Sequence, residues 1–327
     1  MRHRGFYVVA LIVLGLPILF PRSYFVEVNG TAILFNAALA MGLNLLMGYA
    51  GQISLGHAAF FGIGAYATAI LTTRYGLSPY LAMAAGLLLN FCIAYGLARP
   101  LLKLKGHYLA MATLGMGIIV HIFLVQTGRL TGGPDGISNI PNLSVFGWSL
   151  NTDQRWYVAA ALWMLFVLKM SLNLAGSRMG RAFRALHTSE VAAQMMRIDT
   201  TSAKTQVFVL SALIASLTGS LFAHQKAFVS PDSFSFFFSI ELVTMVVLGG
   251  LGSTYGALFG AAFITLLPEL LSSIENYEVM IFGLILMATM MFFPKGLYVT
   301  LLELLQRQMG IKRALNAWGP GKRGPKC

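Results

Sequence analysis

The stretch TQVFVLSALIASLTGSLFAH (205–224) contains no charged residue. A helix needs about 20 mostly apolar residues to cross roughly 30 Å of hydrocarbon, so this stretch is long enough to span a membrane. The composition agrees, because 57% of the 327 residues are hydrophobic and only 10% are charged, whereas soluble domains have about 25% charged residues. These features predict an all-α integral membrane protein.

Further apolar segments lie on both sides of this stretch and predict about ten transmembrane helices in total. They are expected at 5–20, 31–49, 57–73, 80–98, 107–127, 156–174, 205–224, 238–251, 253–272 and 278–293. A glycine-rich turn separates the eighth from the ninth, so hydropathy alone could also fuse those two. We expect one membrane domain over residues 1–300 and an amphipathic basic tail over 301–327, with no soluble domain.

Basic residues predict the orientation of these helices. With the N-terminus in the cytoplasm, 18 of the 23 Lys and Arg residues fall in the inner segments and 5 in the outer ones. This bias follows the positive-inside rule and agrees with an even number of spans. We therefore expect both termini in the cytoplasm, and the net charge of +12 requires no nucleic-acid partner.

The inner loop at residues 177–204, SRMGRAFRALHTSEVAAQMMRIDTTSAK, predicts two short helices separated at Thr188–Ser189. In the first, Phe183 lies on an apolar face and Arg181 and Arg184 lie opposite. In the second, Ser189 is suited to cap the helix and Glu190 suits its dipole. The apolar face of this second helix is expected to consist of Val191, Ala192, Met195 and Met196. Such a helix could fit a groove of another protein or rest on anionic lipid.

Two glycine-rich runs are the other distinctive segments. In GYAGQISLGHAAFFGIGAY (48–66), the polar residues Gln52, Ser54 and His57 accompany Gly56. This run could be a tight helix contact, or it could line a translocation route or its gate. In GGLGSTYGALFGAA (249–262), the glycines at i, i+4 and i+8 predict a flat helix-packing strip, either against this chain or against a second subunit. These glycines are Gly252, Gly256 and Gly260.

The chain lacks the sequence patterns of an enzyme. It contains no GxxxxGK[ST] phosphate loop and no GxSxG nucleophile motif, and its histidines show no metal-ligand spacing. We therefore expect no catalytic residue and no metal site. Glu241 and Glu269 are the acids placed well inside expected spans, where a proton-coupled transporter would need them. Both lie near the outer ends of those spans, so interfacial placement is the simpler explanation.

Six markers along the chain resemble the permease subunits of ABC importers for branched-chain amino acids, the high-affinity leucine/isoleucine/valine transport family. The markers are GYAGQISLGHAAFFGIGAYATA (48–69), KGHYLAMATL (105–114), TGGPDGI (131–137), GRAFRALHTSEVAAQMMRID (180–199), VLGGLGSTYGALFGA (247–261) and FFPKGL (292–297). They occur in the order typical of the family over roughly residues 30–300.

The resemblance implies a bacterial inner-membrane permease that pairs with a second, distinct permease. It further implies two ATP-binding subunits, which would hold ATP and Mg, and a periplasmic substrate-binding protein. SEVAAQ (189–194) is similar to the family's coupling segment, so Arg181, Phe183, Arg184, Glu190, Val191, Ala192 and Met195 are the expected coupling residues. One departure is Arg197, where the family usually has glycine.

The sequence therefore predicts a transport subunit that works by alternating access and is driven by partner ATPases. Gln52, Ser54, Gly56 and His57 are the expected route residues. Two alternatives remain open at this point. The same architecture could import urea, short amides or aromatic acids, or the chain could be a proton-coupled secondary transporter.

Overall fold

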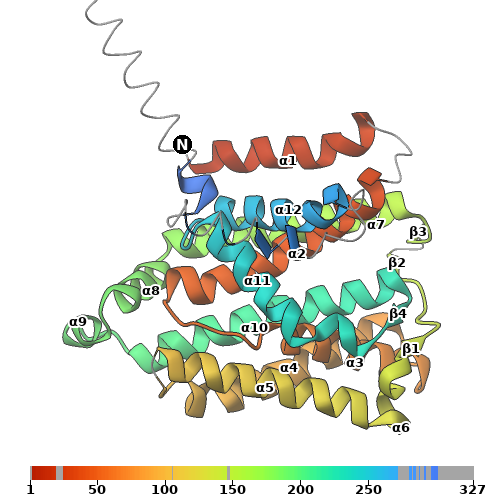
Figure 1. Cartoon of the computed structure of the whole chain (residues 1–327), viewed down its shortest axis with the longest axis horizontal. Coiled ribbons are helices and arrows are strands. Elements are labelled where there is room, and N and C mark those ends of the chain that lie inside the picture. The colour runs from red at the N-terminus through yellow and green to blue at the C-terminus, as the bar shows by residue number, and fades with distance from the viewer. Residues whose placement is uncertain are drawn as a thin grey trace, which may run out of the picture.

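The computed structural model describes residues 2–19, 25–104, 106–145, 148–271 and parts of 280–300. Within these residues the fold is almost entirely helical, and most of the long helices run along the longest axis of the molecule (Figure 1). The expected tail at 301–327 and most of the expected tenth span at 278–293 lie outside the described residues.

The helices follow one another with short connections. They are α1 (Arg2–Leu19), α2 (Gly30–Asn44), α3 (His57–Thr73), α4 (Pro79–Leu101), α5 (His107–Gln126), α6 (Gly128–Thr131), α7 (Asp153–Gly176), α8 (Arg178–Thr188), α9 (Glu190–Met195), α10 (Thr200–Lys226), α11 (Phe236–Gly249) and α12 (Thr254–Leu271). Two π-helical turns, η1 (Phe25–Asn29) and η2 (Leu45–Tyr49), extend α2 at its two ends, and two 3₁₀ turns are η3 (Gly133–Asp135) and η4 (Pro231–Phe234).

Four two-residue strands form two small antiparallel pairs. Strand β1 (Ile137–Ser138) pairs with β4 (Phe228–Val229), and β2 (Ser144–Val145) pairs with β3 (Trp148–Ser149). All four lie at one end of the molecule, whereas α8 and α9 project at the opposite end (Figure 1). We call these two ends the strand end and the loop end.

Nine of the ten expected membrane segments coincide with helices of the structure. Five helices are long and apolar enough to cross a membrane, namely Glu27–Tyr49, Pro79–Leu101, His107–Gln126, Asp153–Gly176 and Thr200–Lys226. Three shorter apolar helices lie at Gly5–Pro17, Phe236–Gly249 and Thr254–Leu270. The turn at 250–253 separates α11 from α12, so the eighth and ninth segments are not fused.

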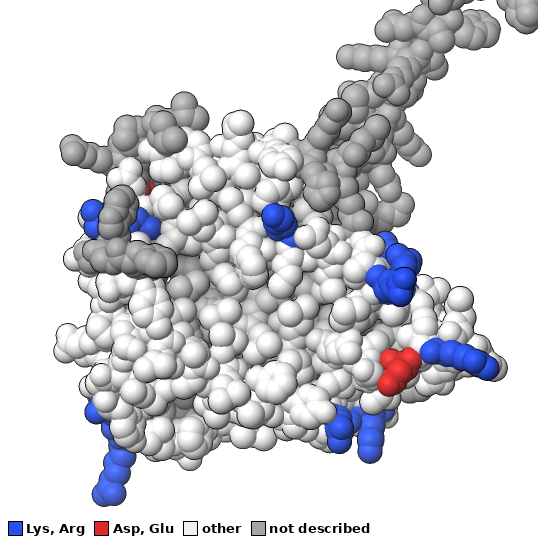
Figure 2. Space-filling model, turned by 180° about the vertical axis from the view of Figure 1, so that it is seen from behind, with Lys and Arg blue, Asp and Glu red and all other residues white. Residues whose placement is uncertain are grey.

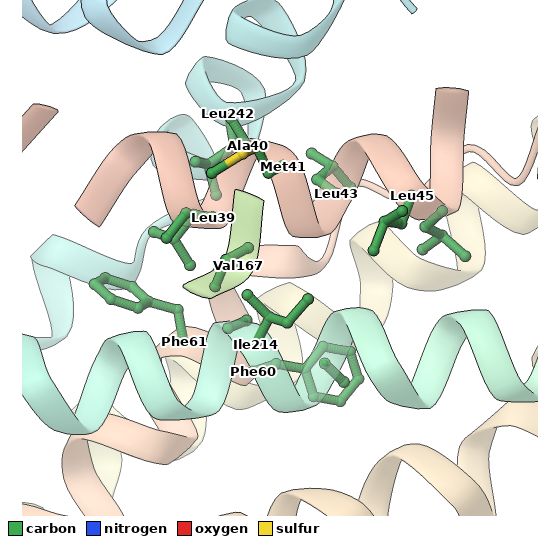
Figure 3. Packing of buried hydrophobic residues seen from close by; sticks show 14 of the residues in the cluster. Leu39, Ala40, Met41, Leu43, Leu45, Phe60, Phe61, Val167, Ile214 and Leu242 are labelled. Atoms are coloured by element: carbon green, nitrogen blue, oxygen red, sulfur yellow. The ribbon is translucent and has the colours of Figure 1, made fainter. Parts of the chain in front are cut away.

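The core is built around α2 and α10. Leu39 of α2, Val167 of α7 and Ile214 of α10 belong to one buried cluster with residues of α3 (Figure 3). Glycines bring α3 and α10 together, because a methyl group on Gly64 or Gly219 would collide with the main chain of the other helix. Small residues at such contacts are typical of helix pairs in membranes.

Uncharged polar side chains join the same helices across the core. Asn90 of α4 donates through Nδ2 to Ser216 Oγ of α10 at 2.7 Å and to the Phe60 carbonyl of α3 at 3.1 Å. Thr68 of α3 donates to Ser220 Oγ of α10 at 2.8 Å. These bonds satisfy polar groups that hydrocarbon could not, and they fix the relative register of α3, α4 and α10.

Charge is sparse on the face of the molecule that Figure 2 shows. The middle of the face seen in Figure 2 carries almost no Lys, Arg, Asp or Glu, and most of the visible charges lie toward its margins. Together with the apolar helices, this distribution is that of a multi-pass membrane protein.

Candidate functional site

One face of helix α8 packs against the rest of the protein, and the opposite face is exposed. Phe183 and Leu186 are 1% and 5% exposed, whereas Arg181 and Arg184 face outward. The Ser177 side chain caps the helix by accepting the Gly180 N–H at 3.2 Å. The expected separation of apolar and basic faces is confirmed. Phe183 is buried against this chain and anchors α8 to the bundle.

Helix α9 is tied to α10 at its first turn. Ser189 Oγ accepts the Ala192 N–H at 3.3 Å, which confirms the predicted cap. Glu190 Oε1 accepts a hydrogen bond from Lys204 Nζ at 2.8 Å, and the two side chains are 24% and 5% exposed. Glu190 therefore joins α9 to the first turns of α10.

The far side of α9 is an exposed apolar surface. Val191, Met195 and Met196 are 63%, 82% and 75% exposed, and Ala192 is also exposed. Ala193 turns inward and is 1% exposed. We call Val191, Ala192, Met195 and Met196 the α9 apolar face. Exposed apolar patches of this kind mark interaction surfaces, and methionine adapts its shape to a partner.

Arg197 lies in the turn that ends α9, where its backbone has an unusual conformation. Its φ of +58° lies in the left-handed region, which favours glycine. Arg197 N–H bonds to the Gln194 carbonyl at 2.9 Å, and Ile198 N–H bonds to the Ala193 carbonyl at 3.1 Å. This pair of bonds is a Schellman motif, in which glycine is the usual residue at the Arg197 position. The turn therefore closes despite the arginine, at the cost of backbone strain.

A break in the helices lies next to this loop. The chain leaves η2 after Tyr49 and is non-helical over residues 50–56, until α3 begins at His57. We call this segment the break. His187, near the end of α8, contacts the Gly48 carbonyl through Nδ1 at 2.9 Å. Gly51, with φ +68°, also lies against His187. These two contacts place the end of α8 directly against the break.

The four expected route residues all lie in this break or at its end. Gly56 packs against the Thr113 carbonyl of α5, so the helix-contact alternative holds for that glycine. The Gln52 side chain bonds back to its own segment at 3.2 Å. Ser54 and His57 are 2% and 1% exposed, and Ser54 Oγ and His57 Nε2 have no hydrogen-bond partner among the described residues.

The expected glycine strip is partly wrong. Gly252 lies in the turn before α12, with φ +76°, so it does not share a helix face with the other two glycines. Gly250 and Gly252 both have positive φ angles, +109° and +76°, which helical residues do not adopt, so the helix is interrupted before Thr254. Gly256 and Gly260 do face α11, where a methyl group would collide with the carbonyls of Gly249 and Met245. The strip therefore packs within this chain.

Sequence reasoning missed the side chains that join distant segments. Asn44 of α2 donates to the Ser253 carbonyl at 3.1 Å and accepts the Gly252 N–H at 3.0 Å. It thereby holds the α11–α12 turn beside the break, and His187 connects the break to α8. An uncharged polar residue inside an apolar span was the available signal for Asn44. Nothing local indicates the partners of Asn44, His187 or Lys204.

Comparison with known proteins agrees with this architecture. Residues 31–292 match the family described as the permease component of branched-chain amino acid transport systems. The chain is 33% identical over 322 residues to the high-affinity branched-chain amino acid transport system permease protein LivM of Escherichia coli, covering 89% of this chain and 74% of that protein. LivM of Salmonella typhimurium is 33% identical over 282 residues, which cover 79% of this chain and 66% of that protein.

A more distant relative is the permease protein LivH of Salmonella typhimurium, which is 26% identical over 80% of this chain and 90% of its own length. No solved structure gives a significant match. The family match covers most of the chain and includes α2 to α12, the break and the loop that carries α8 and α9. The chain therefore belongs to the family of permease components of branched-chain amino acid transport systems.

Proposed function

We propose that this chain is the membrane subunit through which an ABC importer translocates branched-chain amino acids. The family match over residues 31–292 carries the proposal, and the exposed α9 apolar face, on a helix joined to α10 by the Glu190–Lys204 ion pair, supports a docking role for this loop. The names of the LivM and LivH relatives support the substrate class. Alternating access, driven by partner ATPases, is the expected mechanism.

In this proposal α8 and α9 form the coupling segment. Val191, Ala192 and Met195 would dock into an ATP-binding subunit, while Arg181 and Arg184 contact its acidic surface. Force would then leave α9 by two routes. The first passes through the Glu190–Lys204 ion pair to α10, and the second passes through buried Phe183 and His187 to the break.

The proposed route through the membrane includes the break. Ser54 and His57 offer buried polar groups that can meet a polar cargo, and Gln52 and Gly56 lie in the same segment. Broken helices that line a cavity are a common way to place such groups inside a bilayer.

The proposed assembly contains a second permease, two ATP-binding subunits that hold ATP and Mg, and a periplasmic substrate-binding protein. The chain itself would supply no ATP hydrolysis. The bias of basic residues supports a bacterial inner-membrane location with ten spans, and with both termini and the α8–α9 loop in the cytoplasm.

Reconstitution into liposomes tests the proposal. We expect leucine uptake only when the complete assembly, the binding protein and ATP are present, and we expect excess urea not to compete. Uptake by the purified chain alone under a proton gradient would contradict the proposal and favour a secondary transporter.

A further inference from the structure

A cavity of about 300 Å³ lies near the strand end of the molecule, apart from the break and the α8–α9 loop. Its walls come from the start of α2, the first turns of α3 and α11, and the end of α10. Ligand sites usually occupy about 300–1,000 Å³, so this cavity suits a small metabolite and not a large cofactor.

Two opposite charges line this cavity. Lys226 is the last residue of α10, and Glu241 is a half-buried residue of the otherwise apolar helix α11. They do not form an ion pair with each other, and within the described part of the chain neither one pairs with another residue. A carboxylate on an apolar helix in a membrane is costly unless it is paired or faces water, so Glu241 on the cavity wall requires water or a ligand of opposite charge.

A third polar group, Asn36, is held in a defined orientation. Its Nδ2 donates to Thr265 Oγ1 of α12 at 2.9 Å, which leaves Oδ1 as a hydrogen-bond acceptor for the cavity that Asn36 lines. A carboxylate and an amide carbonyl are both acceptors, as an ammonium group requires. Lys226 offers the donors that a carboxylate requires.

The rest of the cavity is walled largely by phenyl rings. The ring of Phe61 in α3 packs against two of the others, with ring centroids 5.3 Å from Phe222 and 5.5 Å from Phe238. All three rings line the cavity, as does Phe35. Such a wall offers a large apolar contact area to an aliphatic side chain.

We propose that this cavity is a binding site for a zwitterionic α-amino acid with an apolar side chain. Lys226 binds the carboxylate, Glu241 and Asn36 bind the ammonium group, and the phenylalanine wall holds the side chain. Urea or a neutral amide would leave both charges unpaired. The inference rests on the proposed function, since it places a subsite for the cargo at the strand end of the permease.

Protection of an engineered cysteine tests the site without transport. The assay uses the complete complex of both permeases and both ATP-binding subunits in nanodiscs, with no substrate-binding protein. This chain carries Ser233→Cys, at the cavity wall, with Cys92→Ser and Cys327→Ser. A cationic thiosulfonate reagent reports access to the new thiol. At a leucine concentration about four times its Kd, occupancy should slow modification about fivefold.

The charge requirement is tested with analogues and variants. Isoamylamine lacks the carboxylate and 4-methylpentanoate lacks the ammonium group, so neither should protect as leucine does. Glu241→Gln and Lys226→Gln should each abolish protection by leucine. Arg129→Gln and Asp135→Asn remove the same charges from exposed positions at the strand end and should leave protection intact.

The outcomes separate this inference from the proposed function. If the complex imports leucine with ATP but leucine leaves Ser233→Cys modification unchanged, the cavity proposal is wrong and the function stands. Equal protection by isoamylamine or 4-methylpentanoate would also overturn it. If leucine protects the thiol but ATP drives no leucine uptake, the site stands and the proposed function is wrong. Modification of Asp232→Cys, next to the cavity, should be insensitive to leucine.

Discussion

Replacing Glu190 with glutamine should loosen α9 from α10 more than replacing its partner Lys204 with methionine. The two side chains differ in burial, since Lys204 is 5% exposed and Glu190 is 24% exposed. Glu190→Gln leaves a buried ammonium group without its counter-charge. Lys204→Met leaves a carboxylate that can reach water, so the lost interaction is partly replaced by hydration.

The expected sizes follow from this asymmetry. Removing one member of a fully buried ion pair costs about 3–5 kcal/mol. Glu190 is partly exposed, and glutamine still accepts a neutral hydrogen bond, so Glu190→Gln should cost about 2 kcal/mol, which is within the range for charge-assisted hydrogen bonds. Lys204→Met should cost about 1 kcal/mol or less, as for exposed ion pairs.

Amide hydrogen exchange over residues 189–199, measured in the assembled complex, reports the local opening of α9. A loss of 2 kcal/mol corresponds to about 30-fold faster exchange. The double variant completes a thermodynamic cycle and isolates the pair energy. Arg178→Gln, on the exposed surface of α8, is the control and should not change exchange. Exchange in Glu190→Gln within about twofold of the unmodified chain, or a larger effect of Lys204→Met, would show that the buried ammonium group does not depend on Glu190.

Three further predictions address the loop and the glycine contacts. Val191→Asp removes about 1.5 kcal/mol of apolar burial at the docking surface, so the concentration of ATP-binding subunits that half-saturates their binding to the permease should rise about tenfold. An unchanged concentration would exclude the α9 apolar face as the docking surface. Arg197→Gly should relieve about 1 kcal/mol of the strain that the left-handed backbone conformation imposes at this position, and it should slow amide exchange at residues 190–198 about fivefold. Faster exchange would contradict the strain argument. Gly260→Ala should lower the thermal unfolding temperature, at a cost of about 1–3 kcal/mol, because the added methyl group meets the Met245 carbonyl. Gly15→Ala is the control, because its methyl group has open space and should not lower the unfolding temperature; equal unfolding temperatures would contradict the packing argument.

Local patterns in the sequence predicted the local structure well. The apolar segments became helices, Ser189 caps α9, and Val191 and Met195 share an exposed face. Each of these features depends on residues within one or two helical turns. Helical periodicity and the preference of serine for the cap position are therefore sufficient to predict them.

Residue contacts within the coupling loop could not be predicted in the same way. Phe183 and Glu190 were both expected to be coupling residues, and the structure adds that Phe183 is buried against this chain and that Glu190 is paired with Lys204. The sequence placed Phe183 on the apolar face of α8 correctly. It could not tell whether that face meets this chain or another one, because both burials produce the same periodicity.

Hydrophobicity, length and charge are local properties, so the order of residues is enough to predict a bundle of apolar helices interrupted by a basic amphipathic loop. Which distant groups meet can be seen only in the folded chain. It joined His187 to Gly48, Asn44 to the α11–α12 turn, and Lys226 and Glu241 to one cavity. Such pairings depend on the depth and rotation of each helix in the bundle, and those are set by side-chain packing between helices far apart in the chain.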